Sequence, residues 1–208
     1  MTKRVLLTGA TGFVGQHLLN HLLQQDVELY VLARQPHSFA SAPPTLHWLV
    51  TPNLADFQGQ GLPEQLDIII HLAGRAHVTE REDEKAQYIN VNVTGTERLV
   101  EIALSKSVRH FIYMSSVKVS EPMHYSSPLR EEDHVNPVGI YAQTKYQAES
   151  SLNKLAAMGT CVSVIRPPLV YGPGVKANMA HLVSLVRLSP FLPFVRVKNR
   201  RSIIGIRN

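Results

Sequence analysis

The sequence has 208 residues, of which 44% are hydrophobic and 18% are charged. This composition is typical of a globular protein with a sizeable core, and it excludes disordered and fibrous chains. The formal net charge of +5 suits nucleic acid or phosphate-bearing small molecules equally well. We favour small molecules and expect no nucleic-acid partner, because most basic residues are scattered. The exception is a cluster near the C-terminus, Arg196, Lys198, Arg200 and Arg201.

Cys161 is the only cysteine, which excludes an intrachain disulfide and a cysteine metal cluster. It lies in an apolar run and is interpreted as a core residue. The sequence predicts no metal site. No signal-peptide pattern precedes the first predicted strand, and no apolar run is long enough to span a bilayer. We therefore expect a cytoplasmic protein without a membrane partner.

The first candidate site is a glycine-rich segment, residues 8–15, between an apolar run at 5–7 and an amphipathic helical pattern. Gly9 permits a tight turn, Gly12 lets the backbone approach a pyrophosphate, and Gly15 lets the helix pack closely. Unpaired N–H groups and the dipole at the start of the helix favour a phosphate. The strand–turn–helix context predicts dinucleotide binding, whereas an ordinary glycine-rich turn is the alternative.

Strands and helices alternate along the rest of the chain. Further strands are expected at residues 28–33, 46–50, 67–72, 109–115 and 161–166. Helices are expected at residues 84–106, 138–158 and 178–188. Residues 36–44, 51–65 and 117–136 have the composition of loops. This alternation predicts an α/β fold, a Rossmann-type doubly wound parallel sheet with helices on both faces.

Arg34 follows the second predicted strand. In dinucleotide-binding folds an acidic residue at this place binds the ribose 2′-hydroxyl, whereas an arginine accommodates a 2′-phosphate. The sequence therefore favours NADP over NAD, with NAD as the alternative. A solvated surface arginine is the other interpretation of Arg34.

Tyr141 and Lys145 are four residues apart on a predicted helix, which places them on one face. A lysine ammonium near a phenol lowers the pKa of the phenol, so that it can take a proton from an alcohol or return one to a ketone. Ser116 follows the strand predicted at residues 109–115, where a hydroxyl can donate to a substrate oxygen. A chance pair on a solvated helix face is the alternative interpretation.

Six motifs occur in a fixed order. They are TGATGFVG (8–15), IHLAG (70–74), NVTGT (92–96), SSVKV (115–119), YAQTK (141–145) and RPPLVYGPG (166–174). Together they resemble the extended short-chain dehydrogenase/reductases, and more narrowly the NAD-dependent epimerase/dehydratase family, which acts on nucleotide sugars. Within that family the chain looks most similar to a bacterial surface-polysaccharide branch of UDP-glucose 4-epimerase-like proteins and nucleotide-sugar 4-ketoreductases.

The resemblance implies roles for particular residues. Ser116, Tyr141 and Lys145 would be catalytic, with Asn92 as a structural and proton-relay residue. The implied cofactor contacts are Gly9, Gly12, Phe13, Val14, Gly15, Arg34, Asn53, Leu54, Leu72, Ala73, Gly74, Asn92, Tyr141, Lys145, Pro168 and Val170. The implied substrate contacts are Ser116, Tyr141 and Asn178, the last at the diphosphate of the sugar nucleotide. Asn53 departs from the family, because many relatives carry an aspartate there that contacts adenine.

The resemblance also implies a domain organisation and an assembly. We expect an NAD(P)-binding domain over residues 1–167 and an incomplete start of a substrate-binding region over residues 168–208. Extended members of the family continue well past the position of Asn208. A homodimer is expected through the helices at 84–106 and 138–158, and the expected substrate is a nucleoside diphosphate sugar, with UDP favoured.

Two classes of function remain open. The first is an enzyme that transfers a hydride at sugar C4, either as an epimerase or as a 4-keto reductase, with Tyr141 as acid and base. Dehydration is disfavoured, because Val117 and Lys118 stand where dehydratases carry acidic residues. The alternative is a non-catalytic NAD(P)-binding regulatory or scaffold module.

Overall fold

A computed structural model describes residues 2–35, 43–76, 81–120, 128–175, 177–188 and 201–208. Within this part of the chain, the side chains of residues 177 and 178 are not described. The chain divides into two compact units, Met1–Arg166 and Pro167–Asn208.

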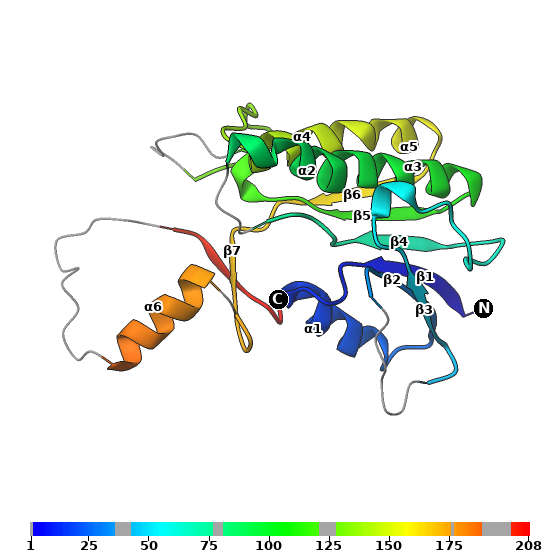
Figure 1. The fold of residues 1–208 in the computed structure, drawn as a ribbon, viewed down its shortest axis with the longest axis horizontal. Coiled ribbons are helices and arrows are strands. Elements are labelled where there is room, and N and C mark those ends of the chain that lie inside the picture. The colour runs from blue at the N-terminus through cyan, green and yellow to red at the C-terminus, as the bar shows by residue number, and fades with distance from the viewer. Residues whose placement is uncertain (1, 36–42, 77–80, 121–127, 176, 189–200) are drawn as a thin grey trace. The chain divides into compact units, whose positions relative to one another are not determined.

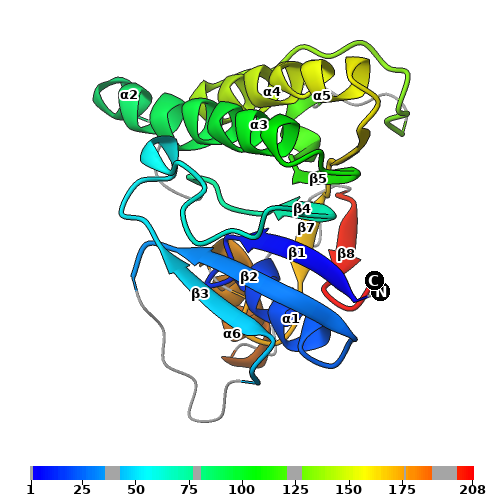
Figure 2. The same ribbon diagram turned by 90° about the vertical axis from the view of Figure 1, so that its right-hand side faces the viewer.

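The first unit is built on a six-stranded, wholly parallel sheet in the order β3-β2-β1-β4-β5-β6 (Figures 1 and 2). The strands are β1 Lys3–Thr8, β2 Val27–Ala33, β3 Leu46–Val50, β4 Ile68–His71, β5 His110–Met114 and β6 Cys161–Ile165. They occur where the sequence predicts them, so the expected Rossmann-type fold is confirmed. The strand order reverses direction between β1 and β4, and in such sheets ligands bind beside the carboxyl ends of the strands at that point.

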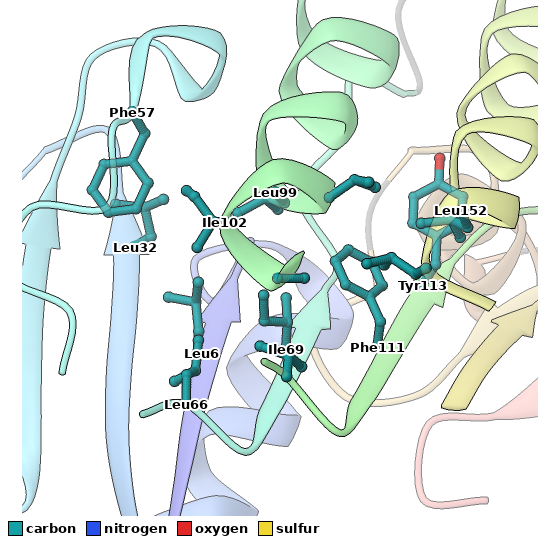
Figure 3. Packing of buried hydrophobic residues seen from close by; sticks show 14 of the residues in the cluster. Leu6, Leu32, Phe57, Leu66, Ile69, Leu99, Ile102, Phe111, Tyr113 and Leu152 are labelled. Carbon is teal, nitrogen blue, oxygen red and sulfur yellow. The ribbon is translucent and has the colours of Figure 1, made fainter. Parts of the chain in front are cut away.

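Helices cover both faces of this sheet. The helix α1 Phe13–Leu22 lies on one face, and α3 Gly95–Ser105, α4 Ile140–Ser151 and α5 Asn153–Ala157 lie on the other (Figures 1 and 2). Successive residues of a strand point to opposite faces. Leu6 therefore joins the core beneath α3 to α5 (Figure 3), while Leu7 joins the core beneath α1. Because both faces are buried, the central strands are continuous apolar runs.

The two long predicted helices are each interrupted. The first is composite: η2 Glu82–Glu84 and α2 Lys85–Tyr88 lead into a π-helical segment, η3 Ile89–Thr94, before α3 begins. The second begins at Ile140 rather than 138, because Gly139 has a φ of 87°, which ends helical geometry. It is broken at Leu152, whose N–H donates to the Glu149 carbonyl three residues earlier. A periodicity of apolar residues does not report either interruption.

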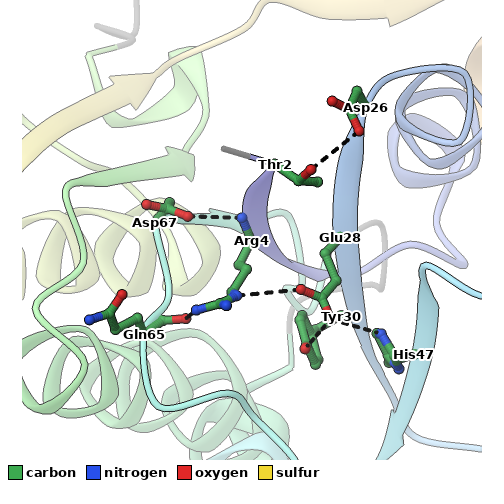
Figure 4. Close-up of polar contacts among 8 residues, drawn as sticks. All are labelled: Thr2, Arg4, Asp26, Glu28, Tyr30, His47, Gln65 and Asp67. Atoms are coloured by element: carbon green, nitrogen blue, oxygen red, sulfur yellow. Dashed lines mark hydrogen bonds and ion pairs between the residues drawn. The ribbon is translucent and has the colours of Figure 1, made fainter.

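Polar side chains gather at the amino-terminal edge of the sheet, at the opposite ends of the strands from the predicted site (Figure 4). Arg4 Nε lies 3.4 Å from Glu28 Oε2, and Tyr30 Oη donates to Glu28 Oε1 at 2.9 Å. His47 Nε2 lies 3.3 Å from the same carboxylate. Burial and the Glu28 carboxylate raise the pKa of Tyr30 to about 12, so this phenol stays protonated. The half-exposed pair of Arg4 and Glu28 is a structural feature away from the site.

The second unit contains β7 Leu169–Tyr171, α6 Ala177–Leu188 and β8 Ile203–Gly205. β7 and β8 pair in parallel as a separate two-stranded sheet. The helix begins one residue before its predicted start, whereas the two strands were not predicted. Each has only three residues, too few for an alternating pattern to be recognised.

One expectation about the core is wrong. Cys161 is exposed rather than buried, because it is the first residue of β6, which lies at the edge of the sheet. Of the predicted basic cluster, only Arg201 lies within the described residues. No helix in the described part of the chain is both long enough and apolar enough to cross a lipid bilayer.

Candidate active site

The turn after β1 packs directly against the end of β4. Gly9 has a φ of 75°, and a Cβ placed on it would lie 2.5 Å from the Ala73 backbone nitrogen. The Leu72 N–H donates to the Thr8 carbonyl at 3.2 Å, and the Ala73 N–H donates to Thr8 Oγ1 at 3.3 Å. Only glycine fits at position 9, both for its conformation and for this close approach.

The first turn of α1 presents unpaired backbone donors. Gly12 is the N-cap residue and has no side chain to cap the helix, and the first turn, which includes Phe13 and Val14, holds no acidic residue. A Cβ on Gly15 would lie 2.0 Å from the Gly9 carbonyl oxygen, so the helix packs tightly on the turn. A Cβ on Gly12 would meet only that same oxygen, at 3.3 Å. Free N–H groups, the helix dipole and the missing Cβ atoms fit the pyrophosphate of a dinucleotide.

Lys145 is buried beneath the helix that carries it. Its side chain comes from α4, one turn after Tyr141, and its Nζ lies 4.5 Å from the centre of the Tyr113 ring. Burial lowers the pKa of Lys145 to about 7, although the Glu149 carboxylate opposes this shift. A Cβ on Gly74 would lie 3.3 Å from Lys145 Nζ. The loop that follows β4 therefore lies close to the ammonium of Lys145.

Ser116 begins a short helical segment that packs against α4, the helix that carries Tyr141. It caps η4 Val117–Val119, with its Oγ accepting from the Lys118 N–H at 3.3 Å. Lys118 Nζ in turn lies 5.9 Å from the centre of the Tyr141 ring. The segment after β5 and the start of α4 thus meet, and a second cation lies near the tyrosine. From the sequence, Lys118 was recognised only as a departure from dehydratases.

Asn92 joins the loop after β4 to α4. Its Oδ1 accepts from the Arg75 N–H at 2.7 Å, and its Nδ2 donates to Thr144 Oγ1 at 3.1 Å. The side chain is buried in the π-helical segment η3. Thr144 adjoins Lys145, so Asn92 ties the loop after β4 to α4 next to the lysine. Irregular π-helical turns occur frequently at functional sites.

His71 is a buried polar residue at the end of β4 that sequence reasoning did not single out. Thr96 Oγ1 donates to the Asn92 carbonyl at 2.7 Å, so it accepts from His71 Nε2–H at 2.9 Å. His71 Nδ1 then accepts from Thr8 Oγ1 at 2.7 Å. Burial, with a further contribution from Lys145, lowers the pKa of His71 to about 3. A neutral histidine of fixed tautomer therefore links β1, β4 and α3 beneath the site.

The remaining predicted contacts are placed differently. Arg34 is exposed just after β2. Asn53 caps η1 Leu54–Asp56, and its Oδ1 accepts from the Ala55 N–H at 3.3 Å and from Asn90 Nδ2 at 3.1 Å. Leu54 packs against Gly95. These two side chains are thus engaged within the protein.

The predicted contacts beyond residue 166 lie in the second unit. Pro168 and Val170 belong to it, Val170 in β7. Asn178 is in α6, and its side chain lies outside the described residues. The structure thus brings together Gly9, Ala73, Gly74, Asn92, Ser116, Tyr141 and Lys145 within the first unit.

Comparison with known sequences shows to which family the chain belongs. The profile of the NAD dependent epimerase/dehydratase family matches residues 5–189. The chain belongs to this family. A UDP-glucose 4-epimerase of Vibrio cholerae is 37% identical over the whole of this chain, which covers 64% of that protein. A GDP-6-deoxy-D-mannose reductase of Pseudomonas aeruginosa is 32% identical over 85% of this chain and 55% of its own length. The chain thus spans less than two thirds of the curated members of the family that it matches here.

Solved structures of the family share the fold. MoeE5 in complex with UDP-glucose and NAD superposes with a TM-score of 0.78 at 26% identity, covering 98% of this chain and 68% of MoeE5. A UDP-galactose 4-epimerase structure gives the same TM-score at 25% identity, with the same coverage. The family and the fold of this chain are therefore established.

Proposed function

We propose that the chain is the nucleotide-binding part of an enzyme that transfers a hydride at C4 of a nucleoside diphosphate sugar, as an epimerase or as a 4-keto reductase. The observation that carries this proposal is the meeting of three elements in one unit. Tyr141 and Lys145 share one face of α4, Ser116 caps the adjoining η4, and a free helix N-terminus follows Gly12. An acid–base group and a dinucleotide cradle together suit an alcohol–ketone interconversion.

Each side chain has a stated part in the proposal. Tyr141 takes the proton of the C4 hydroxyl, or returns it to a C4 ketone. The ammonium of Lys145 favours the phenolate and donates to the nicotinamide ribose, and Ser116 donates to the reacting oxygen. Asn92 holds the backbone around Lys145 and takes part in relaying the proton. When bound, the nicotinamide supplies the hydride chemistry.

The cofactor assignment rests on the turn after β1. The pyrophosphate is assigned to the N-terminus of α1, at Gly9, Gly12, Phe13 and Val14, with Ala73 and Gly74 on the ribose side. Arg34, exposed after β2, supports NADP, whereas the NAD bound in MoeE5 supports NAD. We assign NADP to a reductase and NAD to an epimerase. Which of the two dinucleotides the protein binds more tightly therefore decides between a reductase and an epimerase.

The substrate assignment comes from the relatives. The Vibrio cholerae relative is a UDP-glucose 4-epimerase, and MoeE5 binds UDP-glucose, which supports a UDP-linked sugar. Pro168, Val170 and Asn178 belong to the unit that we assign as the start of the substrate-binding region. Val117 and Lys118 provide no carboxylate beside Tyr141, which argues against dehydration.

The test is substitution of the proposed acid–base group. The Tyr141→Phe variant and the matched control Tyr146→Phe, five residues further along α4 and exposed, are assayed in two reactions. These are interconversion of UDP-glucose and UDP-galactose with NAD, and NADPH oxidation with a UDP-4-keto sugar. We expect Tyr141→Phe to lower kcat at least 100-fold, while Tyr146→Phe keeps the activity. Wild-type protein that binds cofactor without turnover in either assay would favour a non-catalytic module.

A homodimer is part of the proposal. The helical stretches at 84–106 and 138–158 carry exposed apolar residues, among them Ile89, Leu104 and Tyr146. Such residues suit the burial of a helical face against a second copy. Light scattering at micromolar concentration is expected to give twice the monomer mass, and a strictly monomeric mass would contradict this assignment.

A further inference from the structure

We infer that Glu149 and Arg166 form a positioning clamp that fixes Ser116 relative to Tyr141 and Lys145. The clamp is the buried ion pair of these two residues together with the serine hydroxyls that it binds. The inference rests on the proposed function, because it concerns the placement of the proposed catalytic groups.

The ion pair is close and well formed. Arg166 Nη2 donates to Glu149 Oε2 at 2.6 Å, and Arg166 Nε donates to Glu149 Oε1 at 3.0 Å. Glu149 is 8% exposed, and Arg166 is partly buried at the end of β6. A bidentate arginine–carboxylate pair holds both groups in one geometry, unlike a single exposed contact.

Both ends of the segment that carries Ser116 are tied to this pair. Ser115 Oγ donates to Glu149 Oε1, and Arg166 Nη1 donates to Ser120 Oγ at 2.9 Å. Ser115 and Ser120 are themselves buried. The segment between them contains Ser116 and the short helix η4 that it caps. The clamp therefore binds one side of this segment through the carboxylate and the other through the guanidinium.

The same carboxylate belongs to the catalytic helix. Glu149 lies on α4 one turn after Lys145 and two turns after Tyr141. Moving α4 relative to the β5–η4 segment would break the hydrogen bonds to Ser115 and Arg166. One ion pair thus sets the distance between the hydroxyl of Ser116 and the phenol of Tyr141. Positioning of this kind matters because a displacement of about 1 Å can lower turnover roughly 100-fold.

Glu149 also acts on Lys145 through its charge. Among the described residues, the titratable or charged groups near Lys145 are His71 from β4, Tyr113 from β5 and Glu149 from α4. Tyr141 lies one turn before Lys145 on the same helix. Burial lowers the pKa of Lys145, and the Glu149 carboxylate raises it. Removal of that carboxylate charge is therefore expected to lower the pKa of the lysine further.

The first test separates the mechanical part of the clamp from its charge. The Ser115→Ala/Ser120→Ala double variant disconnects the segment and leaves the buried ion pair intact, so it avoids an unpaired buried charge. Amide hydrogen exchange is followed by NMR on the ligand-free protein at Lys118 and Val119, whose N–H groups donate to Ser116 Oγ and to the Ser116 carbonyl. We expect these two amides to exchange about tenfold faster than in the wild type, with no change at Ile112 in β5.

The second test uses the charge. In Glu149→Gln, the pKa of Lys145, measured from the NMR shift of its side chain against pH, is expected to fall. The control is Glu28→Gln, which breaks the half-exposed Glu28–Arg4 pair at the opposite edge of the sheet and should leave the pKa of Lys145 unchanged. The serine double variant keeps the Glu149 charge, and it should also leave the pKa of Lys145 unchanged.

Turnover completes the test. The serine double variant is expected to lower kcat about tenfold or more with little change in KM for the nucleotide sugar. Unchanged exchange at Lys118 and Val119 would overturn the clamp, and so would faster exchange with unaltered kcat. If the wild-type protein shows no turnover, the proposed function fails, whereas the exchange rates and the pKa of Lys145 still decide whether the clamp exists.

Discussion

Lys145 Nζ lies 4.5 Å from the centre of the Tyr113 ring, so the ammonium is buried against an aromatic face under α4. The ammonium loses more free energy of hydration on burial than it gains from its attraction to the ring. The pKa of Lys145 therefore falls to about 7. The ligand-free protein therefore holds its proposed catalytic lysine at a cost in stability. Substitutions of site residues are therefore expected to change the measured stability of the protein.

Lys145→Met should change how stability depends on pH. Lys145 has a folded-state pKa of about 7 and an unfolded value of 10.5, so between these limits the unfolded chain binds a proton that the folded chain lacks. The free energy of unfolding contributed by Lys145 consequently rises with pH, by at most about 1.4 kcal/mol per pH unit. The check is urea unfolding of the ligand-free protein at several pH values. The free energy of unfolding of the wild type should increase relative to that of Lys145→Met as the pH rises above 7. A constant difference between the two proteins would contradict the burial of a charged lysine.

His71→Asn should remove part of the acid sensitivity of the fold. The pKa of His71 is lowered from 6.5 to about 3, so between these values the unfolded chain takes up a proton that the folded chain excludes. Stability from this group is present above pH 6.5 and is lost as the pH falls toward 3. The melting temperature of His71→Asn should fall less steeply with acidification than that of the wild type. The exposed control His134→Asn should behave like the wild type, and equal slopes for all three would count against a buried neutral histidine.

Three glycine substitutions separate folding from binding. Gly15→Ala places a Cβ 2.0 Å from the Gly9 carbonyl oxygen and should destabilise the fold by about 3 kcal/mol or more. Gly12→Ala makes one tight contact, at 3.3 Å, and should leave the fold nearly intact while weakening dinucleotide binding at least tenfold. Gly159→Ala, with a φ of +87° and nothing within 4 Å, measures backbone strain alone, about 1–2 kcal/mol. Thermal unfolding and cofactor titration distinguish these three outcomes, and unchanged binding by Gly12→Ala would contradict the cradle.

Arg34→Glu tests whether Arg34 recognises the ribose 2′-phosphate of NADP. If the guanidinium contacts a 2′-phosphate, the substitution should weaken NADPH binding 10- to 100-fold and spare NADH. The control Lys154→Glu makes the same change of charge at an exposed position of α5. Equal losses of NADPH and NADH affinity in Arg34→Glu would mean that Arg34 does not read the phosphate.

The sequence predicted the framework of the fold because its strands are strong local signals. Runs such as Ile68–His71, buried on both faces, differ clearly from the amphipathic helices between them. The interruptions at Gly139 and Leu152 were not predicted, since they depend on backbone conformation and hydrogen bonding rather than periodicity. Cys161 was misplaced because an apolar run does not reveal that its strand ends the sheet.

The candidate site was only partly accessible from the sequence. Tyr141, Lys145 and Ser116 belong to short patterns, and their proposed roles remain predictions. Glu149 carries a signal that could have been used, since it stands four residues after Lys145 on the same helix. Its link to Arg166 joins residues 17 apart in different elements, and only the packed structure brings them together. The Thr8–His71–Thr96 chain likewise depends on neighbouring strands and a crossover helix.

The measurement that tests the central claim most directly is titration of the 208-residue protein with NADPH and NADH, followed by nicotinamide fluorescence, beside the Gly12→Ala variant. We expect saturable binding of at least one dinucleotide to the wild type and at least tenfold weaker binding to Gly12→Ala. A preference for NADPH would support the 4-keto reductase, and a preference for NADH the epimerase. A folded wild-type protein that binds neither dinucleotide would contradict the account.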